Sequence, residues 1–243
     1  MPHPLTSIIV DAALANNRIQ NFIAKKTQID ADIHCNLKNK IKYDPAAYIS
    51  LLDIIYKKSS GYRVYIAHDI KGSKDEINIL YAITDKNGKN TGEFYIIENK
   101  GKIPIPVLRT DVKKLTTDIK AYLDAAKKTN PKKIETESIF YNTDNLQQLI
   151  NFLNEHLDDI ELVTVRFAAY CDELDPPPAN ADDKKYSHQL SLLFELITKN
   201  PIEGDKEIFF AFGTKMVNGA TSEIDTGVPC PPPPDPSKPC PGA

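Results

Sequence analysis

The segment RVYIAHD at residues 63–69 has a close counterpart later in the chain, RFAAYCD, at residues 166–172. Both begin with Arg, continue through five residues that are mostly apolar, and end with Asp. Alternating apolar residues over such a length are typical of a half-buried β-strand. The repetition predicts that two parts of the chain share one structural unit.

A helical pattern precedes each of these strands. The first covers residues 43–58, where Asp44 suits an N-cap and Pro45 suits the first helical position. The second covers residues 141–157, where Asn142 or Thr143 can act as the cap. Apolar residues at helical spacing form one face of each helix: Tyr48, Leu51, Leu52 and Ile55 in the first, and Leu146, Leu149, Ile150 and Leu153 in the second.

Further elements follow in the same order in the two halves. An amphipathic helix is predicted upstream in each half, at residues 5–26 and 115–128. Asn87-Gly88 has the sequence of a two-residue hairpin turn between strands. The further strands are residues 77–85 and 93–99 in the first half, and residues 188–197 and 207–216 in the second. Each half therefore reads helix, extended link, helix and three strands.

These elements predict an α+β fold built from internally duplicated helix-helix-three-strand antiparallel meander units, in two layers. Short connections make the strands of each meander antiparallel neighbours, and helices are expected on one face of a single six-stranded sheet. The first repeat is residues 1–106 and the second is residues 107–224, together forming one compact domain, with a Pro/Cys-rich tail at residues 225–243. The alternative is an α+β protein whose meanders resemble each other by chance.

Strand alternation assigns inner and outer faces. Tyr62, Val64, Ile66 and His68 share one face, and Val165, Phe167, Ala169 and Cys171 share the matching face. Arg63 and Arg166 lie on the opposite face and are predicted to be solvent-side residues, with a paired anion site as the alternative. The expected core contains Leu51, Ile55, Val64, Ile66, Leu149, Leu153, Val165 and Phe167.

Two segments are rich in proline. Residues 174–186 contain three consecutive prolines and are predicted to form an exposed loop between strands. The tail, residues 225–243, holds eight prolines in nineteen residues and lacks the apolar bulk to build a core. A polyproline-like segment loses little conformational entropy on docking. We therefore expect the tail to lie against a folded surface, either its own body or a neighbouring copy.

The cysteines give two candidate sites. Cys171 ends one predicted strand and His188 opens the next, so a hairpin could pair a nucleophilic thiol with a base. No helix N-terminus or glycine-rich loop follows Cys171, and we favour two ordinary strand residues over a catalytic pair. Cys230 and Cys240 could ligate zinc or form a disulfide, but no histidine is near them, and reduced thiols are the default expectation. We therefore predict no catalytic residue, no metal and no cofactor.

Composition argues against several function classes. The net charge of −3 provides no general attraction for nucleic acid, and the lysines of residues 109–133 form a solvated helix face without interleaved aromatics. No apolar run is long enough for a membrane span, and no signal peptide is evident, so we expect a cytoplasmic protein, with export by a signal-less route as the alternative. Dinucleotide, P-loop, zinc-protease and serine-hydrolase motifs are absent from the sequence.

One resemblance covers residues 45–90 and the tail. GYRVYIAHD, followed by a charged turn and INILYAITDKNG, resembles a pattern in small uncharacterised bacterial proteins, in which a Gly-x-Arg-x-Tyr strand precedes an apolar strand ending in Asp-x-Asn-Gly. The segment PCPPPPDPSKPC is similar to the Pro-Cys-Pro-Pro…Cys tail of many of those proteins. The long first link at residues 24–44 and the ten-residue cysteine spacing depart from the pattern. The resemblance implies no activity and no functional residue.

These observations favour a non-enzymatic interaction or self-assembly protein of bacterial type. Its duplicated body and proline-rich tail would make protein contacts, with a protein partner or a second copy. The alternative is a cysteine-dependent enzyme or thiol redox protein that uses Cys171 with His188. A third hypothesis is a small-ligand binder between the two repeats.

Overall fold

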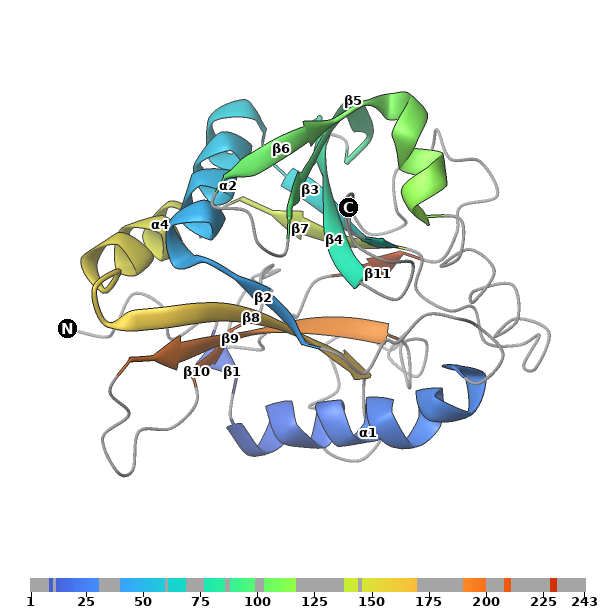
Figure 1. The fold of residues 1–243 in the computed structure, drawn as a ribbon, viewed down its shortest axis with the longest axis vertical. Coiled ribbons are helices and arrows are strands. Elements are labelled where there is room, and N and C mark those ends of the chain that lie inside the picture. Colours follow the sequence, from blue (N-terminus) through green and yellow to red (C-terminus); the bar gives the residue numbers. More distant parts are fainter. Residues whose placement is uncertain are drawn as a thin grey trace, which may run out of the picture.

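In the computed structural model, the chain is a mixed α+β protein with two antiparallel sheets (Figure 1). The helices are α1 (Ala12–Asp30), α2 (Pro45–Lys58), the helical residues 109–116, and α4 (Leu146–Glu155). The structure describes residues 9–10, 12–30, 40–59, 61–68, 77–85, 88–98, 103–116, 138–143, 146–169, 190–199, 208–210 and 228–230.

Sheet A has the strand order β1-β10-β9-β8-β2, and sheet B has the order β11-β7-β3-β4-β5-β6. Every neighbouring pair is antiparallel. The strands of sheet A are β1 (Ile9–Val10), β2 (Ile41–Tyr43), β8 (Ile160–Ala169), β9 (Leu190–Thr198) and β10 (Ile208–Phe210). Those of sheet B are β3 (Gly61–His68), β4 (Ile77–Thr84), β5 (Asn90–Ile97), β6 (Pro104–Val107), β7 (Ser138–Asn142) and β11 (Val228–Cys230).

The expectation of one six-stranded sheet is therefore wrong, and the reason lies in the links ahead of α2 and α4. The link before α2 contains β2, which pairs with β8 of the second half. The link before α4 contains β7, which pairs with β3 of the first half. Because each meander takes a strand from the other half at its first strand, the two meanders do not join edge to edge.

The elements of the two halves follow one another in the same order. The first half reads β1, α1, β2, α2, β3, β4, β5, and the second reads β6, helical residues 109–116, β7, α4, β8, β9, β10. In both sheets, a three-strand meander lies between two strands of the other half. The chain consequently crosses from sheet A to sheet B through α2, and returns through α4.

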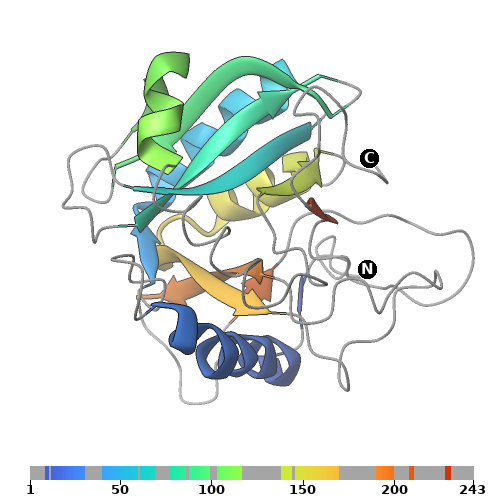
Figure 2. The ribbon, with the colours of Figure 1, turned by 90° about the vertical axis from the view of Figure 1, so that its right-hand side faces the viewer.

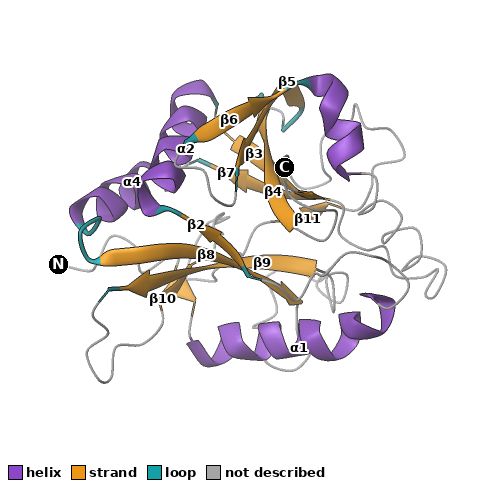
Figure 3. Cartoon of the chain, in the orientation of Figure 1, coloured by secondary structure: helices purple, strands orange, loops and turns teal. Residues whose placement is uncertain are grey.

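The helices lie in distinct places around the sheets (Figure 3). α2 and α4 pack against each other at one end of the molecule, whereas α1 runs along sheet A on the side away from sheet B (Figure 1). The helical residues 109–116 lie on the outer side of sheet B (Figure 2). There, Val112 and Leu115 pack on an apolar cluster that includes Leu80 and Ile96.

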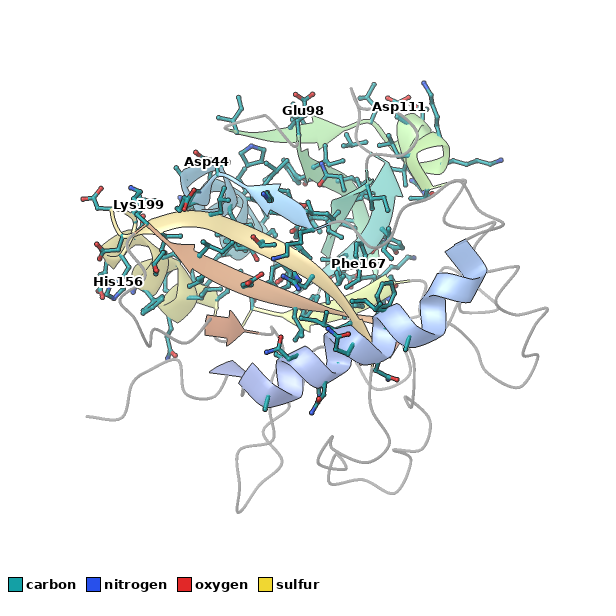
Figure 4. The ribbon with its side chains drawn as sticks, turned by 60° about the horizontal axis from the view of Figure 1, so that its bottom comes forward. Asp44, Glu98, Asp111, His156, Phe167 and Lys199 are labelled. Atoms are coloured by element: carbon teal, nitrogen blue, oxygen red, sulfur yellow. The ribbon has the colours of Figure 1, made fainter. Side chains whose placement is uncertain are left out.

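The main core fills the space between the two sheets and the inner faces of α2 and α4. It includes all eight residues that the sequence assigned to the core, so that prediction is confirmed. Phe167 lies beside α1 (Figure 4), where its ring stacks on Phe22 with ring centroids 5.8 Å apart. Burial of apolar surface on this scale is the dominant force that stabilises such a fold.

The predicted N-cap of α2 is confirmed, whereas the predicted two-residue turn between β4 and β5 is wrong. The Asp44 carboxylate accepts a hydrogen bond from the Ala47 amide at 3.1 Å, which confirms the N-cap of α2 and its Pro45 start. The turn between β4 and β5 instead closes through a backbone bond from the Asp85 amide to the Lys89 carbonyl. It is therefore longer than the predicted two-residue turn, and Gly88 takes the left-handed conformation with φ 71°.

Candidate functional site

A strand from the tail lies on the edge of sheet B. β11 runs antiparallel to β7, with Val228 opposite Phe140, Pro229 opposite Ile139 and Cys230 opposite Ser138. Proline has no N–H to donate, so the ladder bonds with β7 fall to Val228 and Cys230. In an antiparallel ladder, alternate residues point their backbone groups to opposite sides, so the proline nitrogen faces away from β7. The tail thus adds a strand whose outer edge lacks the backbone N–H donor of residue 229.

β11 has no counterpart in sheet A among the described residues. The position equivalent to β7 is held by β2, which pairs with β8 on one side and with no other described strand. β11 is also outside the order of elements that the two halves share. It is therefore an addition to a body whose two sheets already have matching five-strand cores.

The other sheet edges in the described part of the chain carry features that discourage strand pairing. β6 has Pro104 and Pro106, and their missing donors face away from β5 because Ile105 and Val107 make the ladder bonds. β1 has two residues, and β2 has three, with the exposed Lys42 at its centre. β7 has five residues and no charge, proline or glycine. β7 is therefore the edge with the greatest capacity to pair with another strand.

Five tyrosines converge in the core between the sheets. Tyr43, Tyr48, Tyr62, Tyr81 and Tyr141 come from β2, α2, β3, β4 and β7, and each is at most 1% exposed. We call these residues the tyrosine cluster. Its rings stack or tilt against one another at centroid distances between 5.3 and 6.2 Å.

The hydroxyl groups of the tyrosine cluster are close enough to affect one another. The Tyr43 hydroxyl donates to Asn78 Oδ1 at 2.7 Å. Burial, and then the neighbouring tyrosine hydroxyls, raise the pKa of Tyr48 well above its ordinary value. Burial likewise raises the pKa of Tyr62 and of Tyr81. The cluster is consequently neutral and sealed from solvent, which suits a structural role and not a reaction with a solute.

Part of this cluster can be recognised in the sequence. Alternation placed Tyr62 on the inner face of its strand, and helical spacing placed Tyr48 on the inner face of its helix. Tyr43 and Tyr141 stand at the same place ahead of the two helices. What brings them to Tyr62 and Tyr81 is the pairing of β2 and β7 across the halves, which no local pattern reveals.

The two arginines of the repeated segments lie in different surroundings. Arg63 is 6% exposed and donates from Nε and Nη2 to the Gly88 carbonyl, so its predicted solvent-side position is wrong. The Gly88 carbonyl supplies the acceptor that a buried guanidinium needs. Arg166 is half-buried and donates from Nη1 to Glu195 Oε2 at 3.1 Å. Lys40 lies 3.9 Å from the same carboxylate oxygen, so Glu195 is held in a small charged group.

The predicted candidate residues fall mainly outside the described part of the chain. Cys171, His188 and Cys240 lie outside the described residues, as does the proline-rich segment 174–186. Cys230 is described through its backbone, as the last residue of β11. Within the described ranges, no group of three or more His, Cys, Asp or Glu side chains is arranged to hold a metal ion. No helix in those ranges has the length and apolar character required to cross a membrane.

Comparisons with known proteins return no match: no family model fits the chain, and neither a curated protein nor a solved structure is similar to it.

Proposed function

We propose that this chain is a non-enzymatic interaction or self-assembly protein, and that it makes protein contacts by strand addition at the edge of β7. The observation that carries the proposal is the seating of β11 on that edge. Strand addition is a common mode of protein recognition, because backbone hydrogen bonds supply affinity while side chains set the register. The uncharged sequence of β7 suits such pairing.

The body that presents this edge is proposed to be a duplicated unit with exchanged strands. The shared order of elements supports this, because each half gives its first two strands to one sheet and its meander to the other. Tyr43 and Tyr141, which stand at the same place in the two halves, pair with Val163 and Tyr62, so Val64 corresponds to Val165. This correspondence is shifted by two residues from the alignment of RVYIAHD with RFAAYCD, so the two arginines are not at equivalent strand positions. The sequence placed the boundary between the repeats at residue 106; in the proposed strand exchange it lies ahead of β6, so residues 104–106 join the second repeat, and residues 225–243 form a tail outside both.

The partner in this proposal is a second copy of the chain in a cytoplasmic setting. β7 can pair antiparallel with the same strand of another copy, which gives a closed two-fold contact. Two sheets of five strands would then continue into each other. Nucleic acid, membrane lipid and a cofactor have no part in the proposal.

The enzymatic alternative uses Cys171 with His188. A thiol of lowered pKa would be labelled rapidly by a haloacetamide at neutral pH, whereas an ordinary strand cysteine would not. Loss of function in Cys171→Ser or His188→Ala, without a change in melting temperature, would favour the enzyme over the interaction protein.

The proposal is tested by the native particle mass of the full chain, measured by sedimentation from micromolar to millimolar concentration. We expect the mass to rise from that of one 27.2 kDa chain toward a dimer. Asn142→Pro removes an outward-facing donor at the end of β7 and should weaken the association. Lys42→Arg, which keeps the charge on the edge of β2, is the control and should leave the association unchanged. A single-chain mass at every concentration contradicts the proposal.

A further inference from the structure

β11 and the strand that it covers, β7, differ in length and in how firmly each is bonded to the sheet. β7 is a five-residue strand bonded to β3 along its whole length, and β11 covers its residues 138–140. β11 is a three-residue strand with a proline at its centre. A ladder of this length has few hydrogen bonds, so it opens far more readily than the body unfolds.

Edge strands are commonly protected against unwanted pairing by proline, by charge or by shortness. β6 has two prolines, β2 has a central lysine and β1 has two residues, as described above. Among the described edges, β7 has none of these features in its own sequence, and β11 supplies the missing protection. Pro229 then faces outward, as Pro104 and Pro106 do at the opposite edge of the same sheet.

We infer that β11 is a removable cover on β7, and that release of the cover exposes the edge to a second copy of the chain. This inference rests on the proposed function, because it concerns the regulation of the same edge. In the closed state, Val228 and Cys230 occupy the backbone groups of Phe140 and Ser138. In the open state, the same groups of β7 pair with β7 of another copy.

The closed state lowers the apparent affinity between copies. Association requires two open chains, so the apparent dissociation constant is the intrinsic one divided by the square of the open fraction. A cover that is closed in two chains of three weakens association about tenfold. Release of the tail by a ligand, by modification or by proteolysis would restore the full affinity without any change in the body.

The sequence alone left open whether the tail lies on its own body or on a neighbouring copy. The two arrangements predict opposite effects of removing the contact. A strap between copies holds a particle together, so its loss lowers the particle mass. A cover on the chain's own edge prevents association, so its loss raises the particle mass.

The test is a full-length variant in which the cover cannot form. Val228→Pro together with Cys230→Pro removes both ladder donors of β11 and leaves the body unaltered. We expect the midpoint concentration for dimer formation to fall about tenfold or more relative to the unsubstituted chain. Pro229→Ala is the matched control, because the new N–H faces away from β7, and its midpoint should stay within about twofold. Adding Asn142→Pro to the released variant should weaken association again.

Each outcome has a distinct meaning. A fall in the midpoint that Asn142→Pro reverses supports the cover. An unchanged midpoint, in a chain that does associate, overturns the cover and leaves the proposed function intact. A raised midpoint shows that the tail connects copies, which also overturns the cover. If neither protein associates at any concentration, the proposed function fails together with the inference. Two controls exclude misfolding as the cause of these effects. The melting temperatures of the variants should be unchanged, and Asn142→Lys should weaken association as Asn142→Pro does.

Discussion

In sheet B, Tyr62 lies opposite Tyr141 across the β3–β7 pair, whereas in sheet A, Val163 lies opposite Tyr43 across the β8–β2 pair. The next strand shows the same contrast, with Tyr81 in sheet B at the position that Phe194 holds in sheet A. The two sheets thus share a pattern of pairing and differ in the polarity of the side chains that line it. Strand order depends on backbone pairing and apolar alternation, and a tyrosine ring in place of an apolar side chain leaves both unchanged.

The edges of the two sheets differ as well. The outer edge of β2 in sheet A is short and charged, and the equivalent edge of β7 in sheet B is longer, uncharged and covered by β11. The comparison indicates that an edge is protected either by its own sequence or by another segment. Only the second kind of protection can be switched, which is why sheet B is the side proposed for contact.

The largest expected effect appears at alkaline pH and concerns two strands of sheet B together with α2. Tyr48, Tyr62 and Tyr81 have raised pKa values in the folded state, whereas in the unfolded chain each ionises near pH 10. The stability from their protonation is complete below about pH 10 and is lost as the pH rises toward the folded pKa values. Three such groups imply a loss of about 4 kcal/mol per pH unit above pH 10.

Denaturant titrations at several alkaline pH values measure this slope. Tyr81→Phe gives sheet B the residue that sheet A has at the equivalent position and should reduce the slope by about a third. A slope that the substitution leaves unchanged would show that the folded state does not hold this tyrosine neutral.

The next effect concerns the apolar side of the comparison. Phe167 is 4% exposed and stacks on Phe22 of α1. Phe167→Ala should cost about 3–5 kcal/mol, because it removes buried surface and leaves a cavity between sheet A and α1. Ile66→Val, at the corresponding position of sheet B, should cost about 0.5–1.5 kcal/mol. A loss below about 1 kcal/mol for Phe167→Ala in a denaturant titration would contradict its place in the core.

A smaller effect distinguishes two members of the tyrosine cluster. Tyr43→Phe deletes the hydrogen bond to Asn78 in the core and should cost about 1–3 kcal/mol. Tyr48 has no hydrogen-bond partner for its hydroxyl in the described part of the chain, so Tyr48→Phe should be neutral or slightly stabilising. Thermal unfolding of the two variants measures the difference. Equal losses of stability in the two variants would show that the Tyr43–Asn78 hydrogen bond contributes no more than the Tyr48 hydroxyl does.

The smallest effect is at the start of α2, the helix that carries the chain from sheet A to sheet B. Asp44→Ala removes the side-chain acceptor for the Ala47 amide and should cost about 1 kcal/mol. Asp44→Asn keeps an acceptor at the cap and should retain most of the stability. If both variants lose the same amount, the charge of Asp44 and not its hydrogen bond stabilises the helix.

Local patterns in the sequence account for much of this fold. Alternation and helical spacing located β3, β4, β5, β8, β9 and β10, the N-cap of α2 and the core around Val64 and Val165. The predicted cap of the second helix at Asn142 or Thr143 is wrong, because α4 begins at Leu146 and Asn142 belongs to β7.

The same patterns did not locate β1, β2, β6, β7 and β11, because strands of two to five residues give little periodicity. The helix predicted at residues 5–26 is wrong at its start, since Ile9 and Val10 form β1 and α1 begins at Ala12. The two-sheet arrangement follows from β2 and β7, so it could not be predicted. The burial of Arg63 was missed for a similar reason, since its acceptor Gly88 is remote in sequence.

The candidate interaction site was predictable in part. The proline content of the tail indicated that it docks against a surface, but the edge that receives residues 228–230 belongs to β7. A docking position depends on a partner strand, and the sequence shows only the tail half of that contact. The proposed catalytic pair of Cys171 and His188 lies outside the described residues and stays a prediction.

The most direct measurement of the central claim is a disulfide trap between β11 and β7. Cys230 lies directly opposite Ser138, and residues paired in this way have Cα atoms about 5.5 Å apart, within the range that a disulfide spans. The variant carries Ser138→Cys, with Cys35, Cys171 and Cys240 replaced by Ser. On oxidation, we predict a cross-link within a single chain that blocks dimer formation, and recovery of dimer formation on reduction. No cross-link, or a cross-link only between chains, would contradict the account.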